Sequence, residues 1–433
     1  MNTAKIAIVG FGTIGTGVAR LLLESRQRIA RHAGKRLELA RVVDTDLDAK
    51  RDVELPAGVL SDELSKVTDD PEIVAVAQLI GGLEPARTIM LNLLESGKDV
   101  VTANKALLAE HGPELFDRAR QLGRSIAFEA SVAGGIPIIA AMSECLTANR
   151  IDELHAILNG TSNFILCRMD EKGSDYAAAV AEAQRLGYAE ADPAMDVDGS
   201  DAAQKLAILA HLGFGVRANW REIPRTGIDQ VDVADMRYAK ELGYNVKLLA
   251  VARLVSEGLE LHVSPTLIRQ GTPLAEVRGA FNAIRVVGDA VGRVFFHGQG
   301  AGQMPTASAV VADLIDTVVG RTAITFQTLD LWSDENQAPV AVRDPAKVPG
   351  RFYLRFNVDD SPGVMAEIAG ILGRHKISIA SVIQHERTEA DDEVVPLVII
   401  THAAPTGEMD AAMTAIDRLP VVHPGSVRMR IRE

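Results

Sequence analysis

A glycine-rich segment near the N-terminus restricts the fold more than any other part of the sequence. The apolar run Lys5 to Val9 leads directly into Gly10-Phe11-Gly12-Thr13-Ile14-Gly15, and a helical pattern follows. Strand, glycine turn and helix in this order are typical of a Rossmann dinucleotide-binding domain. Gly10 permits the tight turn, Gly12 lets the backbone approach a pyrophosphate, and Gly15 allows close helix packing. The helix N-terminus then faces the phosphates.

The alternation of strands and helices continues to about residue 150. Strands are predicted at 37–43, 73–79, 99–102 and 125–128, with helices at 84–95 and 106–122. Asp44 follows the second strand, where an acid accepts hydrogen bonds from the ribose of NAD. A 2′-phosphate would instead suit the basic residues nearby, which are Arg41, Lys50 and Arg51. The sequence therefore leaves NAD and NADP both open.

Lys105 follows the strand at 99–102 and begins a helix. Ligands of a parallel sheet bind beyond the carboxyl ends of its strands, so Lys105 lies at the edge where a ligand is expected. A cation is also unfavourable at the start of a helix because of the helix dipole. A functional role is favoured over a solvated lysine.

The segment from Gly187 to Lys205 gathers carboxylates just before a helix. The acids are Glu190, Asp192, Asp196, Asp198 and Asp201. Asp201 and Lys205 are four residues apart and share a helix face. That face continues as an apolar stripe, so Lys205 is aimed inward, and burial lowers the pKa of a lysine towards the range useful for proton transfer. A surface ion pair is the alternative, but the clustered acids favour a polar substrate pocket.

Two loops carry polar groups that have either a structural or a binding role. The loop Glu129 to Pro137 combines one acid with two adjacent glycines, so its carbonyls suit either a hard cation or a tight turn. The run Asn159-Gly160-Thr161-Ser162-Asn163 caps a helix and also suits a carboxylate or an amine. Both interpretations remain open for each loop.

Composition excludes several classes of function. The chain has 433 residues, 47% hydrophobic content and a net charge of -13, without a cluster of Lys and Arg. Nucleic acid and anionic membrane surfaces are therefore not expected as partners. Cys145 and Cys167 lie in apolar segments without metal-ligand spacing, which is typical of buried thiols in a reducing cytosol. No segment approaches the roughly 20 apolar residues that span a bilayer, and we expect a cytoplasmic protein.

The predicted fold class is α/β with several domains. A Rossmann domain at 1–150 is followed by an α+β domain at 151–335 with an open mixed sheet, which serves substrate binding, catalysis and dimerisation. The helix around 305–320 is expected to pack back on the first domain, with Gly302 near the cofactor. Residues 336–350 indicate a linker because they are rich in proline and mixed charge. The remainder, 351–433, has the strand, helix, two strands, helix and strand of a ferredoxin-like module.

Taken together, these motifs resemble the homoserine dehydrogenases of the longer bacterial kind, which carry a C-terminal ACT domain. The resemblance covers essentially the whole chain. It depends on 10–15, 101–105, 129–137, 159–163, 187–205 and 300–306. It implies reversible reduction of L-aspartate 4-semialdehyde to L-homoserine with NAD(P)H, on the route to threonine, isoleucine and methionine. Ser162 and Gln204 stand where relatives often carry Thr and His.

The resemblance also implies roles for individual residues. The catalytic residues would be Lys205 as proton donor, Lys105 and Asp201. Substrate would be bound by Glu190, Asp196, Asp201, Lys105, Gly160 and Thr161. The cofactor would be bound by Gly10, Phe11, Gly12, Thr13, Ile14, Gly15, Asp44, Lys105, Gly187 and Gly302. A monovalent cation, usually sodium, would be held by Glu129 and the backbones of Val132, Gly134 and Ile136.

The C-terminal module adds a regulatory expectation. The loop from Asp359 to Gly363 resembles the effector loop of ACT domains, so threonine feedback and a purely dimerising module are both open. We expect a homodimer or homotetramer. Two other functions remain: a dehydrogenase for another amino-acid-like carbonyl compound, and a catalytically silent amino-acid sensor. The retained Lys105 and Lys205 argue against a silent protein.

Overall fold

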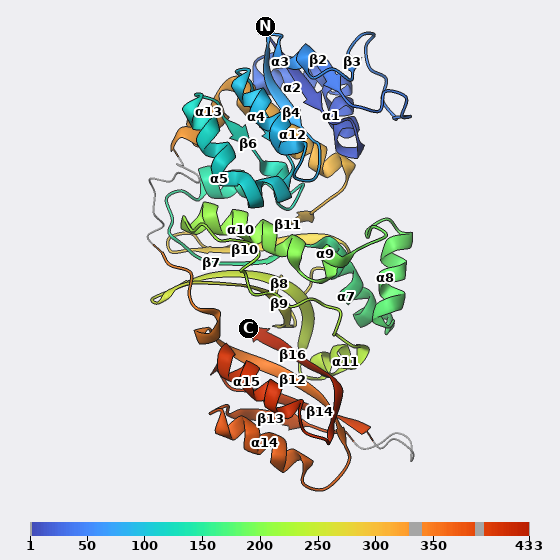
Figure 1. The fold of residues 1–433 in the computed structure, drawn as a ribbon, viewed down its shortest axis with the longest axis vertical. Coiled ribbons are helices and arrows are strands. Elements are labelled where there is room, and N and C mark those ends of the chain that lie inside the picture. Colours follow the sequence, from blue (N-terminus) through green and yellow to red (C-terminus); the bar gives the residue numbers. More distant parts are fainter. Residues whose placement is uncertain (1, 329–339, 386–393, 433) are drawn as a thin grey trace. The chain divides into compact units, whose positions relative to one another are not determined.

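The computed structural model describes residues 2–328, 340–385 and 394–432, and Figure 1 shows its fold. Residues group into two compact units. The first consists of Met1–Ile151, Gln204–Glu222 and Val287–Val340, and the second of Asp152–Ala203, Ile223–Val286 and Ala341–Glu433. The first part of the predicted linker, 336–339, lies outside the described residues. Among the described helices, none is both long and apolar enough to cross a membrane.

The first unit contains a six-stranded parallel sheet with the order β3-β2-β1-β4-β5-β6. Its strands are β1 (Thr3–Val9), β2 (Arg36–Val43), β3 (Leu60–Ser61), β4 (Ile73–Gln78), β5 (Asp99–Thr102) and β6 (Ile126–Ala127). The helices between them are α1 (Thr13–Glu24), α2 (Arg26–Ala33), α3 (Ser65–Thr68), α4 (Ala86–Glu95) and α5 (Lys105–Gln121). Short helical segments follow, namely η1 (Glu129–Ser131), α6 (Ile138–Ala140) and η2 (Ala141–Cys145). The predicted Rossmann arrangement is confirmed.

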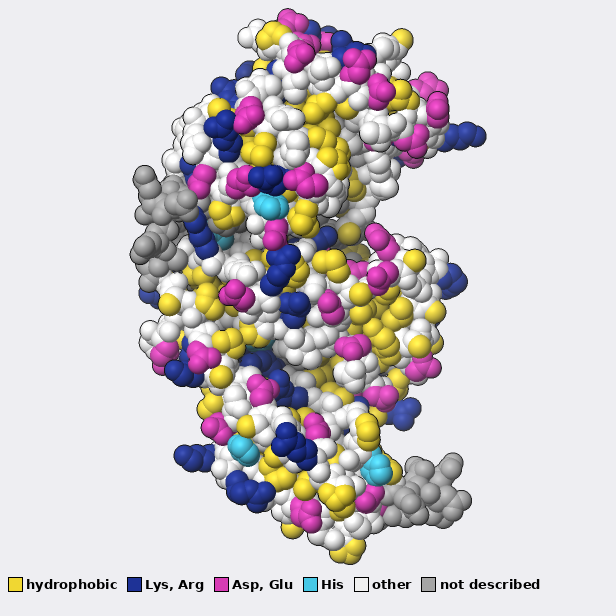
Figure 2. Space-filling model, viewed as in Figure 1, with side chains coloured by type: hydrophobic (Ala, Val, Ile, Leu, Met, Phe, Trp, Pro, Cys, Tyr) yellow, Lys and Arg dark blue, Asp and Glu magenta, His cyan; other side chains and the backbone are white. Residues whose placement is uncertain are grey.

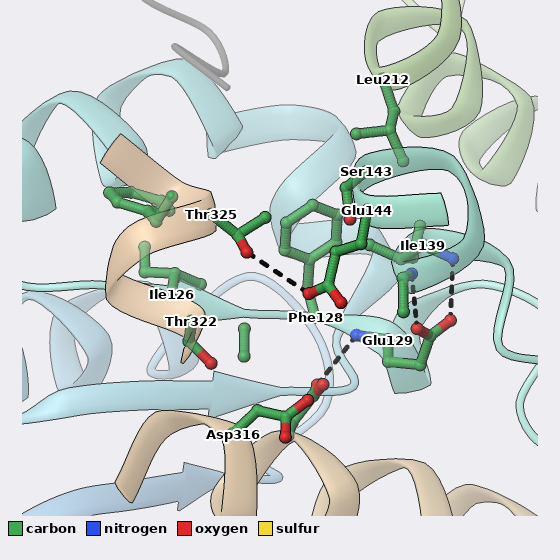
Figure 3. Close-up of a pocket in the computed structure, with 14 residues that line it drawn as sticks. Ile126, Phe128, Glu129, Ile139, Ser143, Glu144, Leu212, Asp316, Thr322 and Thr325 are labelled. Carbon is green, nitrogen blue, oxygen red and sulfur yellow. Dashed lines mark hydrogen bonds between the residues drawn. The ribbon is translucent and has the colours of Figure 1, made fainter. Parts of the chain in front are cut away.

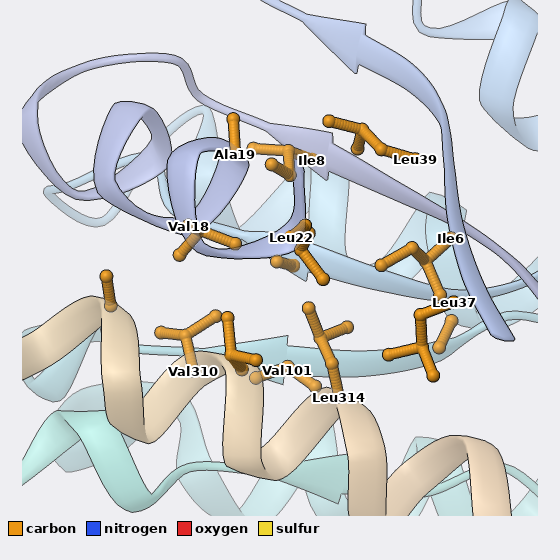
Figure 4. Packing of buried hydrophobic residues seen from close by; sticks show 14 of the residues in the cluster. Ile6, Ile8, Val18, Ala19, Leu22, Leu37, Leu39, Val101, Val310 and Leu314 are labelled. Carbon is orange, nitrogen blue, oxygen red and sulfur yellow. The ribbon is translucent and has the colours of Figure 1, made fainter. Parts of the chain in front are cut away.

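Two helices from the later part of the chain complete the first unit. They are α12 (Gln303–Val319) and α13 (Arg321–Thr328). Helix α12 buries Val310 and Leu314 in the same apolar cluster as Val18 and Leu22 of α1 (Figure 4). A Cβ atom on Gly17 would lie 2.9 Å from the Gln303 side chain, so the two helices approach unusually closely at this glycine. Their mutual burial joins the end of the unit to its beginning.

The second unit is organised around a mixed sheet. Its neighbouring strands are β10-β7-β8-β9-β16-β12-β14-β13, and β15 pairs with β12. The strands are β7 (Ile151–Ile157), β8 (Tyr244–Val255), β9 (Gly258–Arg269), β10 (Phe281–Gly288), β12 (Pro349–Asp359), β13 (Ile379–Ile383), β14 (Val394–Thr401), β15 (Ala404–Pro405) and β16 (Val422–Arg432). Strand β11 (Gly292–Gln299) follows β10 in the chain. The predicted open mixed sheet is confirmed.

The helices of this part of the chain lie between the strands in sequence. They are α7 (Gly160–Lys172), α8 (Tyr176–Arg185), α9 (Ala194–Val197), α10 (Ser200–Phe214), α11 (Val233–Glu241), η3 (Pro345–Lys347), α14 (Val364–Arg374) and α15 (Thr406–Ile416). Helix α11 was not expected from the sequence. Its signal is a capping box. The side chain of Asp232 accepts a hydrogen bond from the backbone N–H of Ala234, and the side chain of Asp235 accepts one from the backbone N–H of Asp232.

The C-terminal module has the order β12, α14, β13, β14, α15 and β16, so the ferredoxin-like prediction is confirmed. Strand β16 also pairs in parallel with β9, through Arg430 with Thr266 and Arg432 with Ile268. The preceding segment is held too, because the N–H of Leu259 donates to the carbonyl of Ala341 at 2.9 Å. One sheet therefore includes both the strands of the C-terminal module and the strands β7 to β10 of the second unit.

A buried ion pair joins α11 to β12. The Arg355 guanidinium contacts the carboxylate of Asp235 through Nε at 2.6 Å and Nη2 at 3.1 Å. The hydroxyl of Tyr353 donates to the same carboxylate at 2.8 Å. The Asp235 side chain is 0% exposed, so its negative charge depends on these partners and on the backbone N–H of Asp232.

We predict that Arg355→Met destabilises the chain strongly, because it leaves the Asp235 carboxylate buried without its cation. The expected loss is about 3–5 kcal/mol. Urea unfolding followed by far-UV circular dichroism measures it. The control is Arg118→Met, which removes the exposed Arg118–Glu95 ion pair and should change stability by less than about 1 kcal/mol. Equal effects of the two substitutions would contradict the role given to the buried pair.

Candidate functional site

The glycine loop has the geometry of a dinucleotide-binding turn. Gly10 adopts φ of 99°, and a Cβ atom on Gly15 would lie 2.2 Å from the carbonyl oxygen of Gly10. Only glycine at position 15 therefore lets α1 begin against the end of β1. Gly12 precedes the helix, and a Cβ atom there would meet nothing within 4 Å. The free N–H groups of the first turn of α1 then face the space where phosphates bind in this fold.

Asp44 and Arg51 hold the glycine loop from the side of β2. The N–H of Phe11 donates to Asp44 Oδ2 at 2.5 Å, and Arg51 Nε donates to the carbonyl of Phe11 at 2.7 Å. The Arg51 guanidinium lies 4.7 Å from the centre of the Phe11 ring. Its two other nitrogens donate to the carbonyls of Ala49 and Asp46. Arg51 thus has a structural role in the loop, in addition to the phosphate contact considered from sequence.

Lys105 is the first residue of α5, and its neighbour Asn104 fixes where that helix begins. The side chain of Asn104 accepts from the N–H of Leu107 at 3.0 Å. Its amide donates to the carbonyls of Ile80 at 3.0 Å and Gly82 at 2.6 Å, beyond the end of β4. The start of α5 is thereby tied to the carboxyl edge of the sheet. Lys105 is half-buried at that edge, within the same unit as the glycine loop.

Asn159 draws two of the predicted acids together in the second unit. Its amide nitrogen donates to Asp196 at 2.7 Å and to Asp201 at 2.9 Å. Its oxygen accepts from the N–H of Ser162 at 2.7 Å, and the Ser162 hydroxyl donates to the carbonyl of Asp196 at 2.6 Å. Asp201 is 5% exposed. The sequence did not indicate that Asn159 joins these acids, because its helix-capping role accounted for it.

The other predicted polar residues of this region differ in exposure. Glu190 is exposed and Asp196 is half-buried. Thr161 donates to the carbonyl of Tyr188 at 2.6 Å. Gly160 begins α7 so close to Ala280 that a Cβ atom would lie 2.6 Å from its carbonyl oxygen. The contact explains why glycine is required there.

Helix α10 carries both Asp201 and Lys205, one turn apart on one face. Lys205 is half-buried, and of the predicted stripe Ile208 and Leu209 are buried and Leu212 is half-buried. The apolar stripe predicted from sequence therefore anchors the helix. Gly187 and Gly302, the remaining predicted cofactor residues, have φ of 78° and 120° and lie at turns that precede α9 and α12.

Glu129 occupies an acidic cavity of about 60 Å³ (Figure 3). Its carboxylate accepts from the N–H groups of Ile139 at 2.9 Å and Ala140 at 2.8 Å, and so caps α6. Its own N–H donates to Asp313 of α12 at 2.9 Å. Burial raises the pKa of Glu129 to about 7, and burial beside Glu129 raises the pKa of Asp313 well above its usual value. Asp313 was missed from sequence; its signal was an acid within the apolar pattern of α12.

The loop after Glu129 offers oxygen donors for a cation. Within the described residues, the carbonyls of Val132 and Gly134 accept no hydrogen bond, while that of Ile136 accepts from Ile138 at 2.8 Å. Hard cations are held by such oxygens. No group of three or more His, Cys, Asp and Glu side chains suited to a metal occurs in the described part of the chain. A cation here would therefore depend mainly on backbone carbonyls.

Comparison with known proteins gives consistent matches. Residues 137–315 match the family profile "Homoserine dehydrogenase", 10–129 match "Homoserine dehydrogenase, NAD binding domain", and 352–420 match "ACT domain". The homoserine dehydrogenase of Pseudomonas aeruginosa is 43% identical, and 100% of each chain is covered. That of Bacillus subtilis is 37% identical over 98% of this chain and 96% of its own.

Solved structures agree. A homoserine dehydrogenase from Thiobacillus denitrificans matches with a TM-score of 0.91 and 41% identity, covering 100% of this chain and 99% of the other. A hyperthermophilic archaeal homoserine dehydrogenase in complex with NADPH matches with a TM-score of 0.61 and 28% identity, covering 73% of this chain and 98% of the other. The first of these two matches extends over the whole chain.

We predict that Arg51→Ala weakens the binding of NADH and NADPH to a similar extent, because Arg51 holds the backbone of the glycine loop. The expected loss is about tenfold in each dissociation constant, or roughly 1.4 kcal/mol. Fluorescence titration of each reduced nucleotide measures it, with the exposed Arg31→Ala as control. A loss confined to NADPH would instead identify Arg51 as a contact of the 2′-phosphate.

Proposed function

From the premise that this chain belongs to the homoserine dehydrogenase family and is an oxidoreductase, we propose that it catalyses the reversible reduction of L-aspartate 4-semialdehyde to L-homoserine with NAD(P)H. This reaction lies on the route to threonine, isoleucine and methionine. The observation that carries the proposal is α10, on which Lys205 follows the buried Asp201 by one turn. An ammonium group in this position can donate a proton to a carbonyl oxygen of the substrate.

In this proposal Lys205 is the proton donor. The bound nicotinamide supplies the hydride, and negative charge then accumulates on the aldehyde oxygen. The ammonium of Lys205 stabilises that charge and transfers its proton to the oxygen. Lys105, at the carboxyl edge of the Rossmann sheet, is a second cation for the same oxygen. Asp201 orients Lys205, since an acid four residues before a lysine faces it on a helix.

Polar groups of the second unit would bind the rest of the substrate. Asp196 and Asp201 are held together by the Asn159 amide, and with Glu190 they suit the substrate ammonium group. The first turn of α7, at Gly160 and Thr161, has the N–H groups that favour a carboxylate. The substrate carries both charges, which explains why acids and a helix N-terminus occur together.

A monovalent cation, sodium, is proposed at the loop from Glu129 to Ile136. Supporting this are the carbonyls of Val132 and Gly134, which accept no hydrogen bond from other described residues. A cation bound there would fix the loop that precedes α6. The role of the cation would be structural, since it would bind backbone oxygens that accept no hydrogen bond from the described residues.

We predict that Lys205→Ala reduces turnover by about 100-fold or more, because general acid catalysis contributes typically 10²–10⁴-fold. The assay follows NAD(P)H absorbance with L-homoserine and oxidised cofactor. Dinucleotide affinity should be unchanged, and the exposed Lys66→Ala should retain full activity. Near-normal turnover in Lys205→Ala would remove this lysine from the mechanism. An inactive wild-type chain would favour another carbonyl substrate or a silent sensor.

Threonine is proposed as the effector of the ACT domain. Gly363 begins α14 with φ of 99°, and Asp359 Oδ1 lies 2.6 Å from His423 Nε2. Replacing Gly363 by Val forces a side chain into a left-handed conformation and should distort this loop. We predict that threonine inhibits the wild-type chain and that Gly363→Val weakens this inhibition about tenfold without lowering basal turnover. Absence of threonine inhibition in the wild type would leave dimerisation as the module's role, and light scattering would then measure the expected dimer or tetramer.

A further inference from the structure

A second cavity, of about 460 Å³, lies within the second unit and apart from the residues discussed so far. Four kinds of segment line it: β9 at His262 to Ser264, the chain around Arg225, the segment at Asp344 to Ala346, and the ACT elements β12, β16 and α15. Figure 2 shows Lys and Arg side chains set back in a hollow where Figure 1 places β9, β16 and α15. The cavity thus joins the ACT module to the central sheet.

Arg430 of β16 is a cation of this cavity that lacks a counter-charge. Its Nη2 donates to the Thr406 hydroxyl at 2.9 Å, and its guanidinium lies 5.3 Å from the centre of the Phe352 ring. Its Nη1 is buried and has no hydrogen-bond partner among the described residues. No carboxylate of the described chain lies within ion-pair distance of it. A guanidinium removed from water in this way is unfavourable unless an anion reaches it.

The acids of the cavity already have partners among its own lining residues. Asp410 pairs with Arg428, and the carboxylate of Asp344 accepts from the N–H of Ala346 at 3.0 Å. Around Arg430 the arginines have a larger effect on its pKa than the more weakly acting Glu260 and Asp410. Burial, followed by the nearby Arg432 and Arg428, lowers the pKa of Arg430 to about 10.

His262 adds a neutral polar group to the same wall. Its Nδ1 lies 3.2 Å from the Ser264 hydroxyl, and its Nε2 is buried without a partner among the described residues. Burial, together with the charge of Arg430, lowers the pKa of His262 well below its usual value. The imidazole is therefore uncharged, and as a lining residue of the cavity it is a neutral polar group for a ligand.

We propose that this cavity binds a small oxyanion, a carboxylate or phosphate group of a metabolite, through Arg430, Arg225 and His262. An arginine fork matches the paired oxygens of either group. The volume is sufficient for a small organic acid or phosphate ester. The site is separate from the loop at Asp359 to Gly363 and does not depend on the oxidoreductase activity.

Occupation of the cavity has a structural consequence. The direct pairing of β16 with β9 extends over three residue pairs only, from Arg430 to Arg432. Arg430 belongs to β16, His262 to β9 and Arg225 to the chain that bridges to Val263. An anion held by all three cross-links the ACT module to the central sheet at this short junction. Binding to the folded state then raises thermal stability.

The test is calorimetric titration of the full chain, saturated with NADPH so that the dinucleotide site does not contribute. The probes are inorganic phosphate and succinate, each added at constant ionic strength against chloride. We expect saturable binding of at least one probe and a higher unfolding temperature. Phosphate binding alone indicates a phosphate ester as the natural ligand, and succinate binding alone indicates an organic acid.

Three substitutions locate the site. Arg430→Gln should weaken the binding about tenfold or more, and Arg225→Gln, at an exposed position, should weaken it as well. Arg418→Gln makes the same charge change at an exposed residue outside the cavity and should have no effect. Unchanged affinity in both cavity variants, or equal loss in the control, would overturn the proposal. So would absence of binding by the wild type together with dissociation of the Arg430→Gln oligomer, which would indicate that a second copy of the chain covers this wall.

Discussion

The close approach of α1 to the end of β1 is the constraint on which the first unit depends. Position 15 has no room for a Cβ atom, because that atom would lie 2.2 Å from the carbonyl oxygen of Gly10. Gly17, half a turn later, has the same property towards α12. Two glycines thus set the distance of one helix from the strand before it and from a helix nearly 300 residues later. Any side chain at either position would move the N–H groups that face a dinucleotide.

The same principle of a fixed helix start recurs at the other functional elements. Asn104 caps α5 and ties it to carbonyls beyond β4, and Asn159 caps α7 while binding Asp196 and Asp201. Each amide satisfies backbone groups and orients a charged neighbour at once. Neither cap can be replaced by Ser or Asp without loss, since Ser provides one donor and ionised Asp none, whereas each amide nitrogen donates two hydrogen bonds. The residues that cap these helices therefore also position polar groups of the candidate site.

Local pattern predicted much of this architecture. The sequence predicted the glycine loop, the alternation of strands and helices of the parallel sheet, and the ferredoxin-like order of elements, because each is set by residues close in sequence. Three features were not predicted. The pairing of β16 with β9 joins two strand edges far apart in the chain, and nothing in either strand specifies its partner. Asp313 of α12, which was not singled out from the sequence, is half-buried beside Glu129. The ion pair of Asp235 with Arg355 likewise needs the tertiary fold before it can be recognised.

These non-local features share a physical character, which is charge buried where two parts of the chain meet. Asp235 and Arg355 compensate each other between α11 and β12, whereas the side-chain contacts of Arg430 in the described part of the chain are a hydroxyl and an aromatic ring near the β9 junction. A buried ion pair fixes one arrangement of the two elements that carry it, since separating them would leave two buried charges without partners. A buried cation without an ion-pair partner costs free energy, and the binding of an anion recovers part of that cost. The link between the ACT module and the central sheet therefore combines a permanent contact with one whose strength depends on ligand, which is the physical requirement for a regulatory module to influence its neighbour.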